Sequence, residues 1–213
     1  MTGLRDRLRG VPAPEPVLSR TREAALTSRQ REILDELGRI FDKGFVEVTM
    51  AELASQLNCS LRTLYGLAEG RNALVLMVVD RNLRAVGRAA NRVVDDNMSA
   101  LDAVRSYLSA ATVAVQNTTP EFADDMASIE EGRALNAAHS EYIIDVTRTL
   151  LDVAVEQQEI SPVDTAAGGT FSTSSLISWL SCCLRHATLF VTPLRNVARS
   201  SSLVLDSIIR LAL

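Results

Sequence analysis

The chain has 213 residues, of which 47% are hydrophobic, and its formal net charge is −4. That length allows one large or two small folded domains, and the lack of any run of eighteen apolar residues excludes a transmembrane helix. Three cysteines are too few and unevenly placed for a disulfide framework, so we expect a cytoplasmic protein. Residues 1–90 hold 14 basic and 11 acidic side chains, whereas residues 91–213 hold 8 and 15. A mildly basic front half is compatible with nucleic-acid binding.

Residues 1–27 are predicted to form a flexible basic arm. Prolines at positions 12, 14 and 16 exclude a helix there. The segment also carries five arginines, which are Arg5, Arg7, Arg9, Arg20 and Arg22. Two interpretations stay open: a tail that makes no contacts, or an arm that touches DNA phosphates or a minor groove.

Residues 28–74 are predicted to form three short helices. The first is expected from about Ser28, as its N-cap, to Lys43, with Gly44 as the stop. Its apolar side chains fall on one helical face, and these are Ile33, Leu34, Leu37, Ile40 and Phe41. This amphipathic pattern predicts that the first helix covers a core.

The second and third helices have clear start signals and a tight turn between them. Thr49 and Glu52 form a capping box, in which hydroxyl and carboxylate satisfy reciprocal backbone donors. Asn58 stands at the turn, where it tolerates a left-handed conformation, and Ser60 caps the third helix. Two short helices joined this way are typical of a helix-turn-helix, which places its second helix in the major groove of DNA.

Residues 75–213 are predicted to form a second, entirely helical domain. A long helix begins near Arg71 and continues into the nineties. Further helices are expected at 100–116, 120–131, 133–158, 163–190 and 196–212, separated by turn signals such as Gly132. No alternating β pattern is present. The predicted fold is therefore all-α, with a helix-turn-helix domain followed by a helical ligand-binding and dimerisation domain.

Residues 29–74 resemble the N-terminal domain of the tetracycline-repressor (TetR) family of bacterial transcriptional regulators. The matching residues are Ile33, Leu34, Phe41, Gly44, Phe45, Thr49, Glu52, Leu53, Ala54, Ser60, Thr63, Leu64, Tyr65, Arg71 and Leu74. The chain departs from the family pattern at Asn58, where glycine is usual, and at Arg71, where lysine is usual. It also has Gly66-Leu67-Ala68 where the family has two bulky residues and a phenylalanine, which normally give a phosphate contact and a packing anchor.

The third helix carries most of the predicted DNA contacts. Arg62 is expected to pair with guanine, and Thr63 to meet a thymine methyl group or a phosphate. Tyr65 and Arg71 are expected to contact phosphates, and Thr49 to cap its helix and contact a phosphate with the same end. The full predicted set is Thr49, Ser60, Leu61, Arg62, Thr63, Tyr65 and Arg71. An ordinary solvated helix face is the alternative.

The second domain offers large side chains that could line a pocket for an apolar or aromatic ligand. They are Tyr107, Phe122, Met126, Tyr142, Phe171, Trp179 and His186. Each could equally belong to a plain core. No metal site or cofactor is expected, since His139 and His186 lack metal-ligand spacing. Small residues between 166 and 181 suit a close helix–helix seam between two copies of the chain.

Together these features predict a homodimeric, ligand-responsive transcriptional repressor that binds a palindromic DNA operator. The alternative is a TetR-like helical protein that binds small molecules or other partners and whose first domain no longer binds DNA, as Gly66-Leu67-Ala68 suggests. An enzyme is the least supported class, because no nucleophile or acid–base arrangement is visible. We expect no membrane partner.

Overall fold

The computed structural model describes residues 3–114 and 118–160, and these residues are entirely helical or irregular, as predicted. Their helices are α1 (Leu4–Arg9), α2 (Arg20–Ala25), α3 (Ser28–Phe41), α4 (Met50–Gln56), α5 (Leu61–Leu67), α6 (Arg71–Arg92), α7 (Ala100–Ala114), α8 (Pro120–Ser128) and α9 (Glu130–Glu156). The predicted helices at 163–190 and 196–212 lie outside the described residues. None of the described helices is long and apolar enough to cross a membrane.

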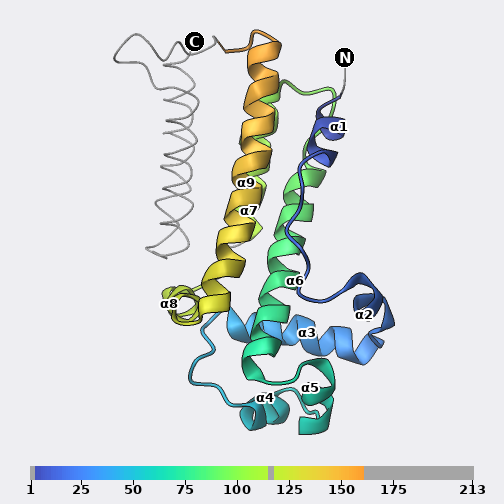
Figure 1. Cartoon of the computed structure of the whole chain (residues 1–213), viewed down its shortest axis with the longest axis vertical. Helices are drawn as coiled ribbons and strands as arrows, with labels where there is room; N and C mark the ends of the chain where they lie inside the picture. The colour runs from blue at the N-terminus through green and yellow to red at the C-terminus, as the bar shows by residue number, and fades with distance from the viewer. Residues whose placement is uncertain (1–2, 115–117, 161–213) are drawn as a thin grey trace.

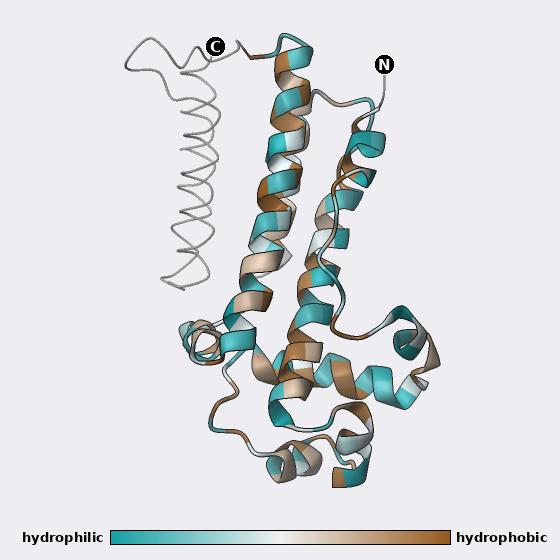
Figure 2. Ribbon diagram, in the orientation of Figure 1, coloured by the Kyte–Doolittle hydropathy of each residue, from teal (hydrophilic) through white to brown (hydrophobic). Residues whose placement is uncertain are grey.

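The long helices α6, α7 and α9 run alongside one another, and the short helices α3, α4 and α5 gather at one end of α6 (Figure 1). Helix α8 lies at that same end, against the start of α9. Hydrophilic and hydrophobic residues alternate around α3 and α6 (Figure 2), as amphipathic helices require when one face covers a core. We call residues 28–74 the head.

Two hydrophobic cores stabilise the described residues, and α6 contributes to both. The first lies beneath α3, α4 and α5 and includes Phe41 and Leu64 as well as Met126 from α8. The second lies between α7, α9 and the far end of α6, and Tyr107 and Leu150 are fully buried in it. Because α6 contributes side chains to both cores, it joins the head to the helices behind it.

The start of α3 differs from its prediction by one residue. Thr27, not Ser28, is the N-cap, because Gln30 completes a capping box with it. The residue three positions after Ser28 is Arg31, which cannot accept a hydrogen bond from the backbone. Gly44 has a φ of +105°, so it reverses the chain after α3 as predicted.

The caps of the helix-turn-helix form as predicted. Thr49 and Glu52 make the reciprocal bonds of a capping box at the start of α4. Asn58 takes a left-handed conformation with φ +46°, and the Ser60 side chain accepts the backbone N–H of Thr63 at the start of α5. Local residue chemistry therefore accounts for this motif.

The prediction of a flexible, helix-free arm over residues 1–27 is wrong. Residues 3–26, which we call the N-terminal strap, contain α1 and α2 and are bound to the body of the protein. Leu4 and Leu8 are buried in the second core, and Leu18 is buried in the first. The prolines prevent a helix only where they stand, and the intervening extended segment lies along α6 (Figure 1).

The predicted break at Gly132 is also wrong. The interruption between α8 and α9 is at Ile129, and Gly132 lies buried within the first turn of α9. A Cβ atom at this position would stand 2.6 Å from the backbone oxygen of Met126. The glycine thus allows the end of α8 to approach α9 closely, and does not mark a turn.

Candidate nucleic-acid interface

Helix α5 presents one face to the first core and the opposite face to solvent. Leu64 and Leu67 are buried, whereas 43% of Leu61 and 53% of Tyr65 are exposed. Arg62 is exposed as well, and its side chain has no hydrogen bond or ion pair within the described residues. The outward face of α5 therefore combines one free guanidinium with an aliphatic and an aromatic side chain.

Ser60 and Thr63 are bonded to each other at the N-terminus of α5. Their hydroxyl oxygens are 2.9 Å apart, and the Thr63 N–H donates to the Ser60 Oγ at 3.1 Å. This pairing fixes the first turn of the helix, and with it the direction of the neighbouring Leu61 and Arg62. The Ser60 and Thr63 hydroxyls therefore help to orient the exposed side chains of α5.

Both hydrogen-bond donors of Thr49 are used in capping α4. Its N–H and its hydroxyl both donate to the Glu52 carboxylate, at 2.8 and 2.7 Å. These two bonds hold the pKa of Glu52 below its ordinary value. A DNA phosphate contact at Thr49 would have to displace this carboxylate, so the predicted contact competes with the cap.

Arg71 lies at the start of α6 and holds the segment that precedes α4. Its Nη1 donates to the backbone oxygens of Phe45 at 3.0 Å and of Val48 at 3.3 Å, and also to that of Val46. Asp125 of α8 binds the same segment, accepting the N–H groups of Phe45 and Val46. Arg71, which we predicted from the sequence to contact a DNA phosphate, thus donates hydrogen bonds to three carbonyls of its own chain.

Asp125 was not predicted as a site residue. It lies 79 residues from Val46 in the sequence, and no local pattern connects an acidic residue of α8 with a turn of the head. In the structure it joins α8 to the segment between α3 and α4, beside a further bond from the Thr119 N–H to the Asp42 carbonyl at 2.9 Å. Helix α8 therefore contacts the head through backbone hydrogen bonds as well as through the first core.

The structure separates the predicted ligand-lining residues. Phe122 and Met126 pack in the first core, where Phe122 meets Phe45 edge to face with 6.0 Å between ring centroids. Tyr107 and Tyr142 belong to the second core. Phe171, Trp179 and His186 lie outside the described residues. The four described side chains thus do not line one common cavity.

Tyr107 and Asn91 leave buried polar atoms without partners among the described residues. Burial raises the pKa of the Tyr107 hydroxyl, and this hydroxyl bonds nothing in the described part of the chain. The Asn91 Nδ2 donates to the Tyr142 hydroxyl at 2.8 Å, but the Asn91 Oδ1 is equally unpartnered there. Buried polar atoms are normally hydrogen-bonded, so these two atoms are the ones that a bound water molecule or ligand atom would satisfy.

His139 is buried and bonds Asp80, with 2.9 Å between Nε2 and Oδ1. The other Asp80 oxygen accepts the Val17 N–H at 3.1 Å. This pair therefore joins α6, α9 and the N-terminal strap, and it gives His139 a structural partner. The described residues contain no cluster of three or more potential metal ligands.

The fold has a counterpart among solved structures. The chain is similar to a TetR family transcriptional regulator, PfmR from Thermus thermophilus, with a TM-score of 0.55 and 23% sequence identity, over 87% of this chain and 97% of that one. No protein-family model and no curated protein matches the sequence. The chain therefore has a TetR-like fold, which confirms the architecture that the helix-turn-helix residues predicted.

Proposed function

We propose that this protein is a DNA-binding transcriptional regulator. The observation that carries the proposal is the outward face of α5, where Leu61, Arg62 and Tyr65 are exposed on a helix held in place by its caps. The TetR-like fold supports the same conclusion, because the solved structure that shares it is named a transcriptional regulator. In this proposal α5 is the recognition helix.

Each exposed side chain of α5 suits a different part of a DNA duplex. Arg62 can donate two hydrogen bonds to guanine O6 and N7, and Leu61, one residue earlier, suits the methyl group of thymine. The Tyr65 hydroxyl can donate to a phosphate, which sets register without reading sequence. The expected half-site therefore contains a guanine and a thymine.

More specifically, the protein is proposed to be a homodimer that represses transcription from a palindromic operator. Helix-turn-helix proteins that bind as dimers place one recognition helix in each half-site. The segments predicted to join the two copies, 163–190 and 196–212, lie outside the described residues. Sedimentation at micromolar concentration tests this part, and a monomer would contradict it.

The protein is also proposed to be regulated by a small molecule. The buried, unpartnered Tyr107 hydroxyl and Asn91 Oδ1 support this proposal, because the polar groups of a ligand can pair with them. Such a ligand would stabilise the folded protein in proportion to its affinity, by mass action. A compound that raises the melting temperature of the wild type but not of Tyr107→Phe would support this subsite.

Selection from random-sequence duplex DNA tests the central proposal. We expect the full chain to enrich one sequence, with an affinity that falls steeply as salt rises. Arg62→Ala should lower the preference for that sequence by about 1–3 kcal/mol. If wild type enriches no sequence and binds no better than Arg62→Ala, the proposal is wrong.

That outcome would favour the alternative, a TetR-like protein whose head no longer binds DNA. Two observations support it: Thr49 and Arg71 already bond groups of their own chain, and Gly66 adds no side chain to α5.

A further inference from the structure

The C-terminal end of α5 is held by the N-terminal strap. The Arg22 Nη2 of α2 donates to the backbone oxygen of Leu67, the last residue of α5, at 3.1 Å. Within the described residues this is the one side-chain donor to a carbonyl in the last turn of that helix. The last carbonyls of a helix lack partners of their own, so a guanidinium placed there satisfies one of them.

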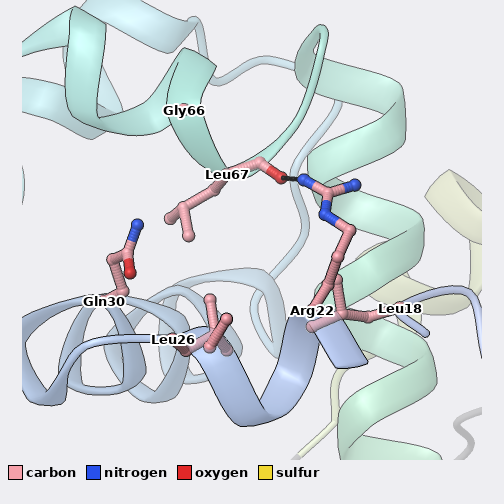
Figure 3. Close-up of a pocket in the computed structure, with 7 residues that line it drawn as sticks. Leu18, Arg22, Leu26, Gln30, Gly66 and Leu67 are labelled. Atoms are coloured by element: carbon pink, nitrogen blue, oxygen red, sulfur yellow. Dashed lines mark hydrogen bonds between the residues drawn. The ribbon is translucent and has the colours of Figure 1, made fainter. Parts of the chain in front are cut away.

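Apolar side chains of the strap support the same end of α5. Leu18 and Leu67 are buried in the first core, and Leu26 packs against it. Figure 3 shows Leu26 and Leu67 facing a cavity that the strap shares with Gln30 of α3 and with α5. The volume of this cavity is about 170 Å³. Gly66 borders this cavity, and a Cβ atom there would meet nothing within 4 Å. The strap therefore packs against the buried Leu67 at the end of α5, while the neighbouring Gly66 stays exposed and adds no packing of its own.

Helix α5 needs such support because its intrinsic stability is low. It has seven residues, which is far below the length at which an isolated helix is stable in water. Gly66 lowers its helix propensity further, since glycine loses more backbone freedom than any other residue on folding. Contacts from outside the helix must then decide how precisely its exposed side chains are positioned.

The other end of the strap is hydrogen-bonded to residues about ninety positions further along the sequence. The Arg5 N–H donates to the Asp96 carboxylate at 2.9 Å, and the Arg5 side chain donates to the Val94 carbonyl at 2.9 Å. Between the two ends, Arg84 of α6 donates to the Pro14 carbonyl at 2.8 Å. The strap is thus hydrogen-bonded to α6 and to the segment that follows α6, and Arg22 lies near its C-terminal end.

We propose that Arg22 is a positioning residue for α5, and that the N-terminal strap holds the recognition helix in its reading orientation. The strap does this through the bond from Arg22 to the Leu67 carbonyl and through the packing of Leu18 and Leu26. The effect on base discrimination rests on the proposed DNA-binding function. The positioning of α5 by Arg22 is a property of the protein without DNA.

Hydrogen exchange on the full chain without DNA tests the positioning directly. Arg22→Ala should increase the exchange of α5 amides by about tenfold, as expected for the loss of one charge-assisted hydrogen bond at a partly exposed site. The amides of α9 should keep wild-type protection, which shows that the protein still folds. The matched control is Arg20→Ala, which removes an exposed arginine of the same helix that has no partner among the described residues. Equal α5 exchange in the two variants would overturn the proposal.

A rescue separates positioning from the mere loss of a positive charge. Gly66→Ala raises the helix propensity of α5, and its Cβ enters open space. In the Arg22→Ala background it should restore most of the protection of α5 without restoring any charge. If the double variant exchanges as fast as Arg22→Ala, the strap does not act by holding the helix.

The DNA readout uses the duplex selected by the wild type and a scrambled duplex of equal composition. Arg22→Ala should reduce the ratio of the two affinities by about tenfold and leave the slope of affinity against salt unchanged. A slope reduced by about one, with unchanged α5 exchange, would make Arg22 a phosphate contact and refute the positioning role. A wild type that binds no duplex would refute the proposed function, and the exchange data would still decide the role of Arg22.

Discussion

Replacing Arg71 with alanine separates two roles for this residue, a phosphate contact and a structural bond. The Arg71 Nη1 donates to the carbonyls of Phe45, Val46 and Val48, and all three bonds disappear in Arg71→Ala. A hydrogen bond to a charged group contributes about 1.5–3 kcal/mol. One nitrogen is shared among three acceptors here and Val46 is 40% exposed, so we expect a total loss of about 2 kcal/mol. That loss corresponds to about a 30-fold increase in the unfolding equilibrium constant.

The assay is urea unfolding of the DNA-free protein, followed by circular dichroism, together with hydrogen exchange at residues 45–48. Arg62→Ala is the matched control, because it removes an exposed arginine of the head that has no partner among the described residues. We expect its stability to stay within about 0.5 kcal/mol of wild type. If Arg71→Ala is as stable as Arg62→Ala and its 45–48 amides exchange at the wild-type rate, the structural role of Arg71 is refuted.

Three further outcomes are expected. Deoxyuridine in place of thymine in the selected duplex should weaken wild-type binding at one position and leave Leu61→Ala unaffected, whereas an equal loss in both proteins would show that Leu61 meets no methyl group. His139→Ala leaves the Asp80 carboxylate buried without its side-chain partner and should destabilise the fold by about 3 kcal/mol in thermal unfolding, and a loss below about 1 kcal/mol would contradict the buried pair. Because the pKa of Glu52 is lowered in the folded protein, its stabilising effect is complete above its ordinary pKa of 4.5 and is lost as the pH falls through the folded value. The stability difference between wild type and Glu52→Ala should therefore shrink in acid, and a pH-independent difference would argue against the capping carboxylate.

The helix-turn-helix could be predicted from the sequence because local interactions define it. The Thr49–Glu52 capping box, the left-handed Asn58 and the Ser60 cap each involve residues within three positions of one another. The apolar face of α3 follows from helical periodicity in the same way. These features place Arg62 on an exposed helix face without any knowledge of the rest of the chain.

Tertiary structure decided how the head is held. Arg22 meets the Leu67 carbonyl across 45 residues, and Asp125 meets the N–H groups of Phe45 and Val46 across 80 and 79. Periodicity and capping rules describe bonds within one or two helical turns, so they carry no information about such pairs. The same reason explains why the strap was predicted to be flexible: its leucines and arginines find partners that only the folded arrangement of α6, α9 and α5 provides.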